Sequence, residues 1–160
     1  MDMGEKNSMP LVELQDLLVK LFLPTLQPPG SPGVELDEDH RLFLLDAMAQ
    51  CPTQSHSPAY DPNVYFAGWN KFFAPGLERV RDRRCWRVYN KMGQAYGFTI
   101  DNAFIVDVES GRSFFLTAAI YTNANGILND DQYEYESVAE PFLADLAEAV
   151  AAEVVGREAA

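Results

Sequence analysis

Residues that build metal sites and disulfide frameworks are scarce in this sequence. Its 160 residues include two cysteines and two histidines. Cys51 and Cys85 form no CxxC motif, and neither His40 nor His56 has a second ligand at metal-binding spacing. We therefore predict no metal site and no cofactor. A disulfide between the two cysteines is compatible with the sequence but is not implied by it.

Basic residues and long apolar runs are also lacking. The 12 Lys and Arg residues are outnumbered by 24 Asp and Glu residues, which gives a formal net charge of −12. A surface this acidic repels phosphate backbones and anionic lipids, so we expect no nucleic-acid partner. No apolar run approaches the ~20 residues of a bilayer span, and residues 1–10 lack the apolar stretch of a secretory signal. As written, the sequence predicts an acidic, cytoplasmic protein with no membrane span.

The N-terminal part of the chain predicts two helices separated by a proline-rich loop. Residues 8–22, SMPLVELQDLLVKLF, carry apolar residues at helical spacing, with Ser8 as the expected N-cap. A second helix is expected to begin near Asp37 and to continue through EDHRLFLLDAMAQ. Between them, LPTLQPPGSPG at 23–33 has too many prolines and glycines for a helix or a central strand.

The second half of the chain predicts a three-stranded antiparallel meander. Alternating side chains predict strands over about 84–90 and over 101–108, and the apolar run SFFLTAAIYTN at 113–123 predicts a third. A short ESGR turn joins the last two strands, and a longer link containing two glycines joins the first two. A closing amphipathic helix is expected to end near Val155, with Ser137 and Glu140 spaced as a capping box.

These elements predict an α+β fold in which helices precede the sheet and one helix follows it. The length fits one domain over 1–160. We divide it into an N-terminal helix and Pro-rich loop at 1–37, a helix and connector at 38–83, and the sheet with its terminal helix at 84–155. Within the connector, the aromatic stretch 64–73 is compatible with a strand or with a loop packed by its own rings, and APG is expected to be a turn.

Three clusters could bind a ligand, and each also has a structural explanation. An acidic ligand could be bound by a group of five arginines, which could equally form a solvated hairpin face: Arg79, Arg81, Arg83, Arg84 and Arg87. A calcium ion could be bound by the acidic residues Asp130, Asp131, Glu134 and Glu136, but the EF-hand spacing is missing. The alternative is an exposed acidic loop. A pocket wall or core packing would suit Trp69, Phe72, Phe73 and Trp86. In each case we favour the structural interpretation.

The run NKMGQAYG places a lysine where a strand is expected to end. Gly93 and Gly97 allow close approach to the backbone, so Lys91 and nearby free N–H groups could hold an anion at one edge of the sheet. The alternative is a solvated lysine beside glycines that only turn the chain. Spacing alone favours this alternative.

This run, followed by DNAFIVDVESGRSFFLTAAIYTN and an amphipathic helix, resembles the C-terminal part of serine hydrolases related to class A β-lactamases and penicillin-binding proteins. In that family a Lys-[Ser/Thr]-Gly triplet lies on a strand that lines the active site, and two antiparallel strands and a helix follow. The resemblance covers about 84–155 and extends weakly to about 38. It implies the back half of such a fold, with hydrolysis of an amide or ester small molecule through an acyl-serine in a complete protein.

The resemblance assigns roles to residues around the triplet. It implies an active-site wall formed by Lys91, Gly93 and Gln94, in which the Gln94 backbone N–H is an oxyanion donor. Met92 stands where the family has a Ser or Thr that binds the substrate carboxylate. Met92, Tyr96 and Trp69 are the expected pocket-lining residues.

Two family motifs are missing or out of order. None of the seven serines Ser8, Ser31, Ser55, Ser57, Ser110, Ser113 and Ser137 has a lysine three residues later, so Ser-x-x-Lys is absent. A Tyr-x-Asn occurs only at Tyr121–Asn123, after the lysine triplet, where we expect a strand end and a turn. We therefore expect a truncated or inactive hydrolase, although the family is largely exported and this chain shows no signal.

The same resemblance predicts an uncovered strand. The family sheet has further strands beside the one that corresponds to SFFLTAAIYT, so here that strand needs an upstream complementary chain or a second copy of the protein. The alternative function is a non-catalytic binding or dimerisation module that uses this exposed edge.

Overall fold

The computed structural model describes residues 8–26 and 34–156 and confirms the α+β class. The Pro-rich segment 27–33 lies outside the described residues. The main elements are α1 (Leu11–Phe22), α2 (Glu38–Ala49), α3 (Ala74–Glu78), β1 (Trp86–Ala95), β2 (Phe98–Asp107), β3 (Ser113–Tyr121) and α4 (Glu140–Val155). Short 3₁₀ turns occupy Pro24–Leu26, Pro52–Gln54 and Arg83–Cys85, and a π-helical turn occupies Tyr135–Ala139.

The three strands form an antiparallel sheet in the order β1-β2-β3. β1 and β2 are joined by Tyr96 and Gly97, whose φ angles of 51° and 87° are those of a tight primed hairpin turn. The predicted end of the first strand near 90 was therefore wrong, because β1 continues to Ala95. The link that looked long in the sequence is a two-residue turn between two ten-residue strands.

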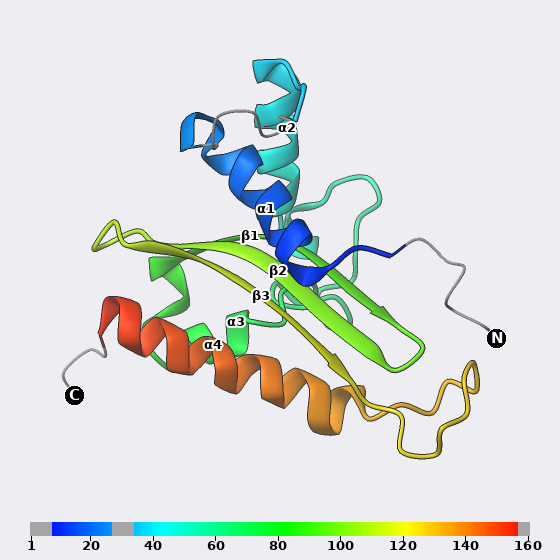
Figure 1. The fold of residues 1–160 in the computed structure, drawn as a ribbon. Helices are drawn as coiled ribbons and strands as arrows, with labels where there is room; N and C mark the ends of the chain where they lie inside the picture. The colour runs from blue at the N-terminus through cyan, green and yellow to red at the C-terminus, as the bar shows by residue number, and fades with distance from the viewer. Residues whose placement is uncertain (1–7, 27–33, 157–160) are drawn as a thin grey trace.

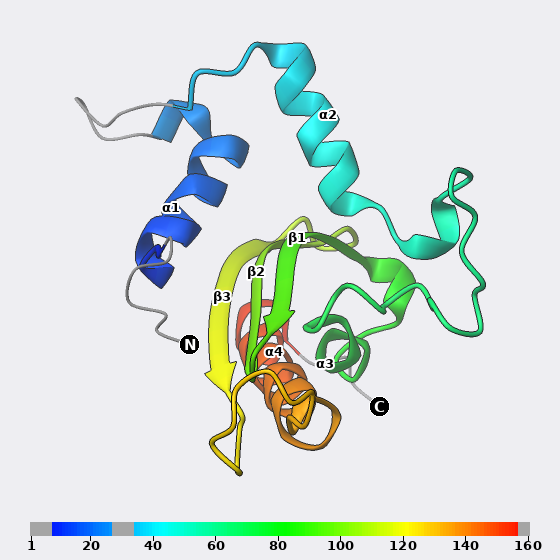
Figure 2. The ribbon, with the colours of Figure 1, turned by 90° about the vertical axis from the view of Figure 1, so that its right-hand side faces the viewer.

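Helices cover both faces of the sheet (Figures 1 and 2). On one face, α3 and α4 pack against inward residues of β2, and the centre of this core holds Ile105, Ala103, Leu77 and Leu143, all at 0% exposure. α4 presents small residues, Ala144, Ala147 and Ala151, to this core. Because small side chains let backbones approach, α4 lies close to both the sheet and α3.

The opposite face is covered less completely. Phe22 of α1 packs against Tyr89, Phe104 and Phe115 of the three strands, with ring centroids 4.5 to 6.3 Å apart. α1 buries only Leu18, and no residue of α2 is buried. This face is held by an aromatic cluster, and apolar residues of both helices remain exposed.

Several predicted element ends differ from the structure. Pro10, not Ser8, is the N-cap of α1, while Asp37 caps α2 by accepting the His40 N–H at 2.8 Å, at the predicted start. No side chain caps α4, because the π-helical turn runs directly into it and the Ser137 capping box does not form. The stretch 64–73 is a loop, and APG opens α3 instead of making a turn.

We predict that Gly76→Ala strongly destabilises the fold. A Cβ at Gly76 would lie 1.8 Å from the Ala144 carbonyl oxygen, so α3 and α4 would have to separate. Overpacking of this kind lowers the free energy of unfolding by about 3 kcal/mol, as measured by urea denaturation. Gly68→Ala is the matched control, since the nearest atom to its Cβ would be on the Phe66 ring at 3.5 Å, an ordinary van der Waals contact. Equal stabilities of the two variants would contradict the close helix contact.

Candidate active-site wall and the buried network beside it

Lys91 lies in the interior of β1 and not at a strand end. It pairs with Asn102 of β2, its side chain is exposed, and its Nζ donates to the Met92 carbonyl at 2.5 Å. Within residues 8–26 and 34–156, β2 is the one strand that pairs with β1, so β1 is an edge strand of the sheet. The lysine of the triplet therefore stands on an edge strand.

The backbone of β1 exposes alternate residues at this edge. In a two-residue hairpin the flanking residues Ala95 and Phe98 form a hydrogen-bonded pair, so residues at odd positions of β1 bond to β2. Even-numbered residues consequently direct their N–H and C=O groups away from β2. The Met92 carbonyl, which accepts from Lys91, follows this pattern, and the N–H of Gln94 therefore points to the open edge.

Side chains around the triplet divide between the two faces of the sheet. Lys91 and Gly93 lie on the α1 side, whereas Met92 lies on the other side and packs against the core. The Gln94 side chain donates to Thr99 Oγ1 and to Glu140 Oε1, each at 3.4 Å. Tyr96 lies in the hairpin turn. Lys91, Gly93 and Gln94 are thus close together in β1, but their side chains do not lie on one face of the sheet. What they share is their position on the edge strand.

A buried lysine that the sequence analysis missed lies beside this edge. Lys71 is 4% exposed, and its Nζ donates to the carbonyls of Met48 and Val88 at 3.0 and 2.9 Å and to Asn90 Oδ1 at 2.8 Å. Met48 belongs to the last turn of α2, where carbonyls lack helical partners and a cation is favourable. One ammonium therefore fixes the end of α2 to β1.

Asn90 connects this lysine to a buried carboxylate. Its Nδ2 donates to the Asn70 carbonyl and to Asp101 Oδ1, both at 2.8 Å. Asp101 is fully buried, and its Oδ2 accepts the Phe72 N–H at 2.9 Å. The segment 70–72 is thereby fastened along the first half of the β1 edge. The second half of the β1 edge, which contains Met92 and Gln94, makes none of these contacts with segment 70–72.

Burial dominates the ionisation of both charged groups. It lowers the pKa of Lys71, although the nearby Cys51 and Asp101 act in the opposite direction. Burial also raises the pKa of Asp101 to about 6, against the hydrogen bonds from Asn90 and Phe72 and the charge of Lys71. Asp101 is therefore a carboxyl group that changes charge within the range in which proteins are stable.

The sequence held a partial signal for this network. Strand alternation places Asn90 on the same face as Val88 and places Asp101 on the same face as Ala103, so both polar residues point toward the core. Two inward polar residues in adjacent strands require partners. Lys71 itself carries no such signal, because it lies in a loop whose structure the sequence left undetermined.

Two grooves lie near the network, but neither includes the wall. A groove of about 940 Å³ is bounded by α2, α3 and the first half of β1, and Lys71 lines it together with Leu45 and Trp86. Trp69 lines a second groove of about 500 Å³ with Tyr60 and Tyr65, and successive rings of these three residues are in tilted and edge contact, with centroids 5.0 Å apart. Neither set of lining residues contains Lys91 or Gln94. Phe72, Phe73 and Trp86 are core residues.

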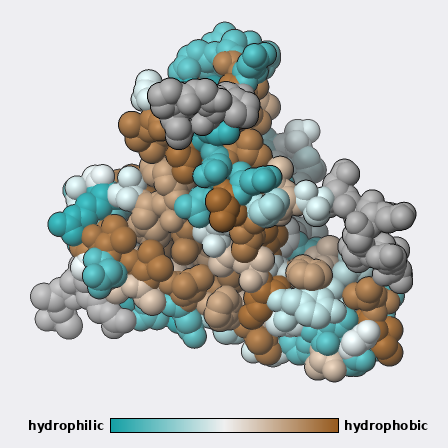
Figure 3. All heavy atoms as spheres, viewed as in Figure 1, coloured by the Kyte–Doolittle hydropathy of each residue, from teal (hydrophilic) through white to brown (hydrophobic). Residues whose placement is uncertain are grey.

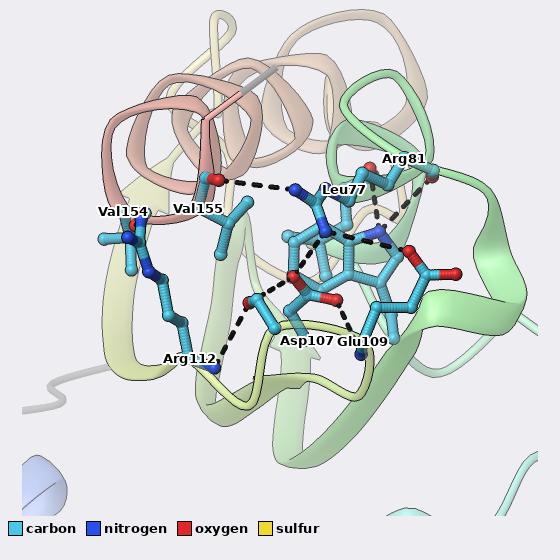
Figure 4. Close-up of polar contacts among 9 residues, drawn as sticks. Leu77, Arg81, Asp107, Glu109, Arg112, Val154 and Val155 are labelled. Atoms are coloured by element: carbon cyan, nitrogen blue, oxygen red, sulfur yellow. Dashed lines mark hydrogen bonds and ion pairs between the residues drawn. The ribbon is translucent and has the colours of Figure 1, made fainter. Parts of the chain in front are cut away.

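The arginine cluster does not form a hairpin face. Figure 4 shows Arg81 donating to the fully buried Asp107 at the end of β2, at 2.7 Å, and Arg112 donating to the Val154 carbonyl at 2.8 Å. Arg79 pairs with Asp145 and Glu148 of α4. Burial is the largest single influence on the pKa of Asp107, and it raises this pKa. The hydrogen bonds from Ser110 and Glu109 and the charge of Arg81 act together in the opposite direction and leave the pKa below its ordinary value.

The remaining candidate groups are placed as follows. Cys51 and Cys85 are free thiols. Within residues 8–26 and 34–156, no three His, Cys, Asp or Glu side chains are grouped as metal ligands, which includes the loop with Asp130. In the same residues, no helix combines the length and the apolar character needed to cross a bilayer.

Comparisons with known proteins give no relative for this arrangement. No family model matches the chain, and no curated protein or solved structure is similar to it. Assignment of a function therefore rests on the residues of the chain itself, chiefly the open half of β1 and the network that covers the other half.

We predict a stability difference that depends on the pH through Asp101. Its pKa is about 6 in the fold and near 3.8 without the fold, so its stabilising effect is complete below pH 3.8 and is lost as the pH rises through 6. The free energy of unfolding of the wild type minus that of Asp101→Asn should therefore fall by about 2.4 kcal/mol between pH 4 and pH 7. Urea denaturation at each pH measures this difference. The exposed Asp16→Asn variant is the control, and an equal pH dependence of all three proteins would contradict the assignment.

Proposed function

We propose that the chain is the sheet portion of a β-lactamase-related serine hydrolase, with Lys91, Gly93 and Gln94 as one wall of its active site. The observation that carries this proposal is the position of the Lys-Met-Gly triplet on an edge strand, with the Gln94 N–H pointing to the open half of that edge. Two antiparallel strands and a helix follow in the order that the resemblance implies.

The chemistry of this edge suits a developing negative charge. A lysine ammonium and an outward N–H group lie within four residues on one strand, and no backbone strand competes for the N–H. One donor aimed at an oxyanion stabilises an acyl-transfer transition state by ~3 kcal/mol. In a complete active site the wall would therefore hold the carbonyl oxygen of an amide or ester substrate.

The chain supplies no complete catalytic set. Its serines lack the Ser-x-x-Lys spacing, and Met92 sends its side chain into the core instead of offering a hydroxyl group to a substrate carboxylate. We infer that the nucleophile comes from polypeptide outside this sequence. The chain alone is then inactive in acyl transfer.

Exposed apolar residues on the helices support a missing complementary part. Leu42 and Phe43 of α2 are 51% and 70% exposed, and Val12 of α1 is 72% exposed. Helices of a finished domain bury one face, whereas α2 has no buried residue. An upstream complementary chain that packs on α1 and α2 would close this side of the fold.

A second candidate function is a binding or dimerisation module. The observation that favours it is the outer edge of β3, since among the described residues this strand pairs with β2 alone. This role needs no nucleophile.

We predict that the purified chain forms no covalent adduct with a fluorophosphonate probe, because no serine has an adjacent base of the family type. Intact-protein mass spectrometry measures this, with circular dichroism confirming that the sample is folded. A stoichiometric adduct, or nitrocefin hydrolysis that Lys91→Ala abolishes, would contradict the absence of a nucleophile.

We further predict weak binding of benzylpenicillin at the wall. Titration followed by NMR should shift the amide signals of residues 92–95, and Lys91→Ala should weaken binding about threefold, because one solvent-exposed ionic contact contributes ~0.7 kcal/mol. Lys20→Ala on α1 is the control for a general loss of charge. Shifts that are absent, or that survive Lys91→Ala unchanged, would remove the support for an active-site wall.

A further inference from the structure

The outer edge of β3 lacks the features that keep edge strands apart. Residues Ser113–Tyr121 contain no charged residue, no proline and no glycine. β1, the other edge strand, contains Arg87, Lys91 and Gly93, and the Lys71 ammonium binds the outward Val88 carbonyl in its first half at 2.9 Å. Charges, breaks and covering segments are the usual protection of an edge. One edge of this sheet is therefore protected and the other is not.

The backbone groups that β3 leaves open can be assigned. The Asp107 N–H donates to the Arg112 carbonyl at 2.9 Å, and the Thr122 N–H donates to the Gly97 carbonyl at 2.8 Å. Even-numbered residues at both ends of β3 thus bond toward β2. Because bonding alternates along an antiparallel strand, Phe115, Thr117 and Ala119 direct their N–H and C=O groups to the open edge.

Apolar surface borders this edge. The view of Figure 1 looks onto β3, and Figure 3 shows apolar residues gathered along that strand and upward over α1. The exposed apolar residues of α1 and β3 include Leu11 and Leu17, at 40% and 41%, and Tyr121 at 49%. A partner strand would cover apolar side chains as well as the open backbone groups.

We propose that this partner is β3 of a second copy of the chain, paired antiparallel about a two-fold axis at Thr117. Thr117 then faces its own counterpart, and Phe115 faces Ala119 of the other copy, so the open groups of each strand meet those of the other. The two sheets become one continuous sheet. The proposal deepens the second candidate function, on which it rests, by naming the partner and the register.

Charges at the two ends of β3 favour this antiparallel arrangement. Arg112 precedes the strand, and the acidic loop with Asp130 and Asp131 follows it at the opposite end (Figure 1). Antiparallel pairing brings the arginine end of one copy to the acidic end of the other. Parallel pairing would bring like charges together, and the net charge of −12 would oppose any association without such local complementarity.

The test is the oligomeric state of three proteins, measured by size exclusion with light scattering across a concentration series. Wild type is expected to be a dimer, and Ala119→Lys, which adds a charge at the seam on an exposed side chain, a folded monomer. Gln94→Lys adds the same charge at the opposite sheet edge and should remain dimeric. A monomeric wild type, a dimeric Ala119→Lys protein or a monomeric Gln94→Lys protein would overturn the proposal.

Cross-linking tests the register independently of these variants. In a Cys51→Ser background, Thr117→Cys places two thiols on the two-fold axis within reach of a disulfide, and oxidation should link the copies. Ser113→Cys should not, because Ser113 faces Tyr121 of the other copy. Equal cross-linking of both variants, or none of Thr117→Cys, would overturn the register. Neither outcome affects the proposed active-site wall on β1. That wall is tested separately, by the NMR titration with benzylpenicillin and by the fluorophosphonate probe.

Discussion

Two elements that are far apart in the sequence, α2 and β1, are joined by the ammonium of Lys71. It binds the last turn of α2, the Val88 carbonyl on β1 and the Asn90 side chain, which in turn bonds to Asp101. Removing this buried cation would leave its oxygen partners unpaired, a cost of about 1–3 kcal/mol for each buried group. The network therefore decides where segment 70–72 lies, and so which half of the β1 edge is covered and which half is open to a ligand.

The sheet separates two environments that serve different purposes. The side of α3 and α4 is a closed core of alanine and aliphatic contacts, in which Met92 has become a packing residue. The side of α1 and α2 is incompletely closed and carries Lys91. This division explains why the triplet resembles an active-site motif in the sequence but presents only a lysine and a backbone N–H at the edge of β1.

Much of this fold is visible in the sequence because it depends on local patterns. The helical spacing of Leu14, Leu18 and Phe22 and the alternation along β2 predict α1 and β2 well. β1 was cut short because its second half is polar and contains Gly93, as an edge strand permits. α3 is only five residues long, and the close approach of Gly76 to Ala144 that holds it is a tertiary contact. The partners of Lys71 are likewise distant in sequence, so its role could not be predicted, whereas Lys91 could be selected from its motif.

The central claim is that the wall at Gln94 is an open strand edge beside a covered one. Amide hydrogen exchange of the folded chain, followed by NMR, tests it directly through two neighbouring residues. The Gly93 amide is bonded to β2 and should exchange slowly, while the Gln94 amide faces solvent and should exchange close to its unprotected rate. Equal protection of the two amides would contradict the account, because another group would then occupy the edge that we propose for a substrate oxygen.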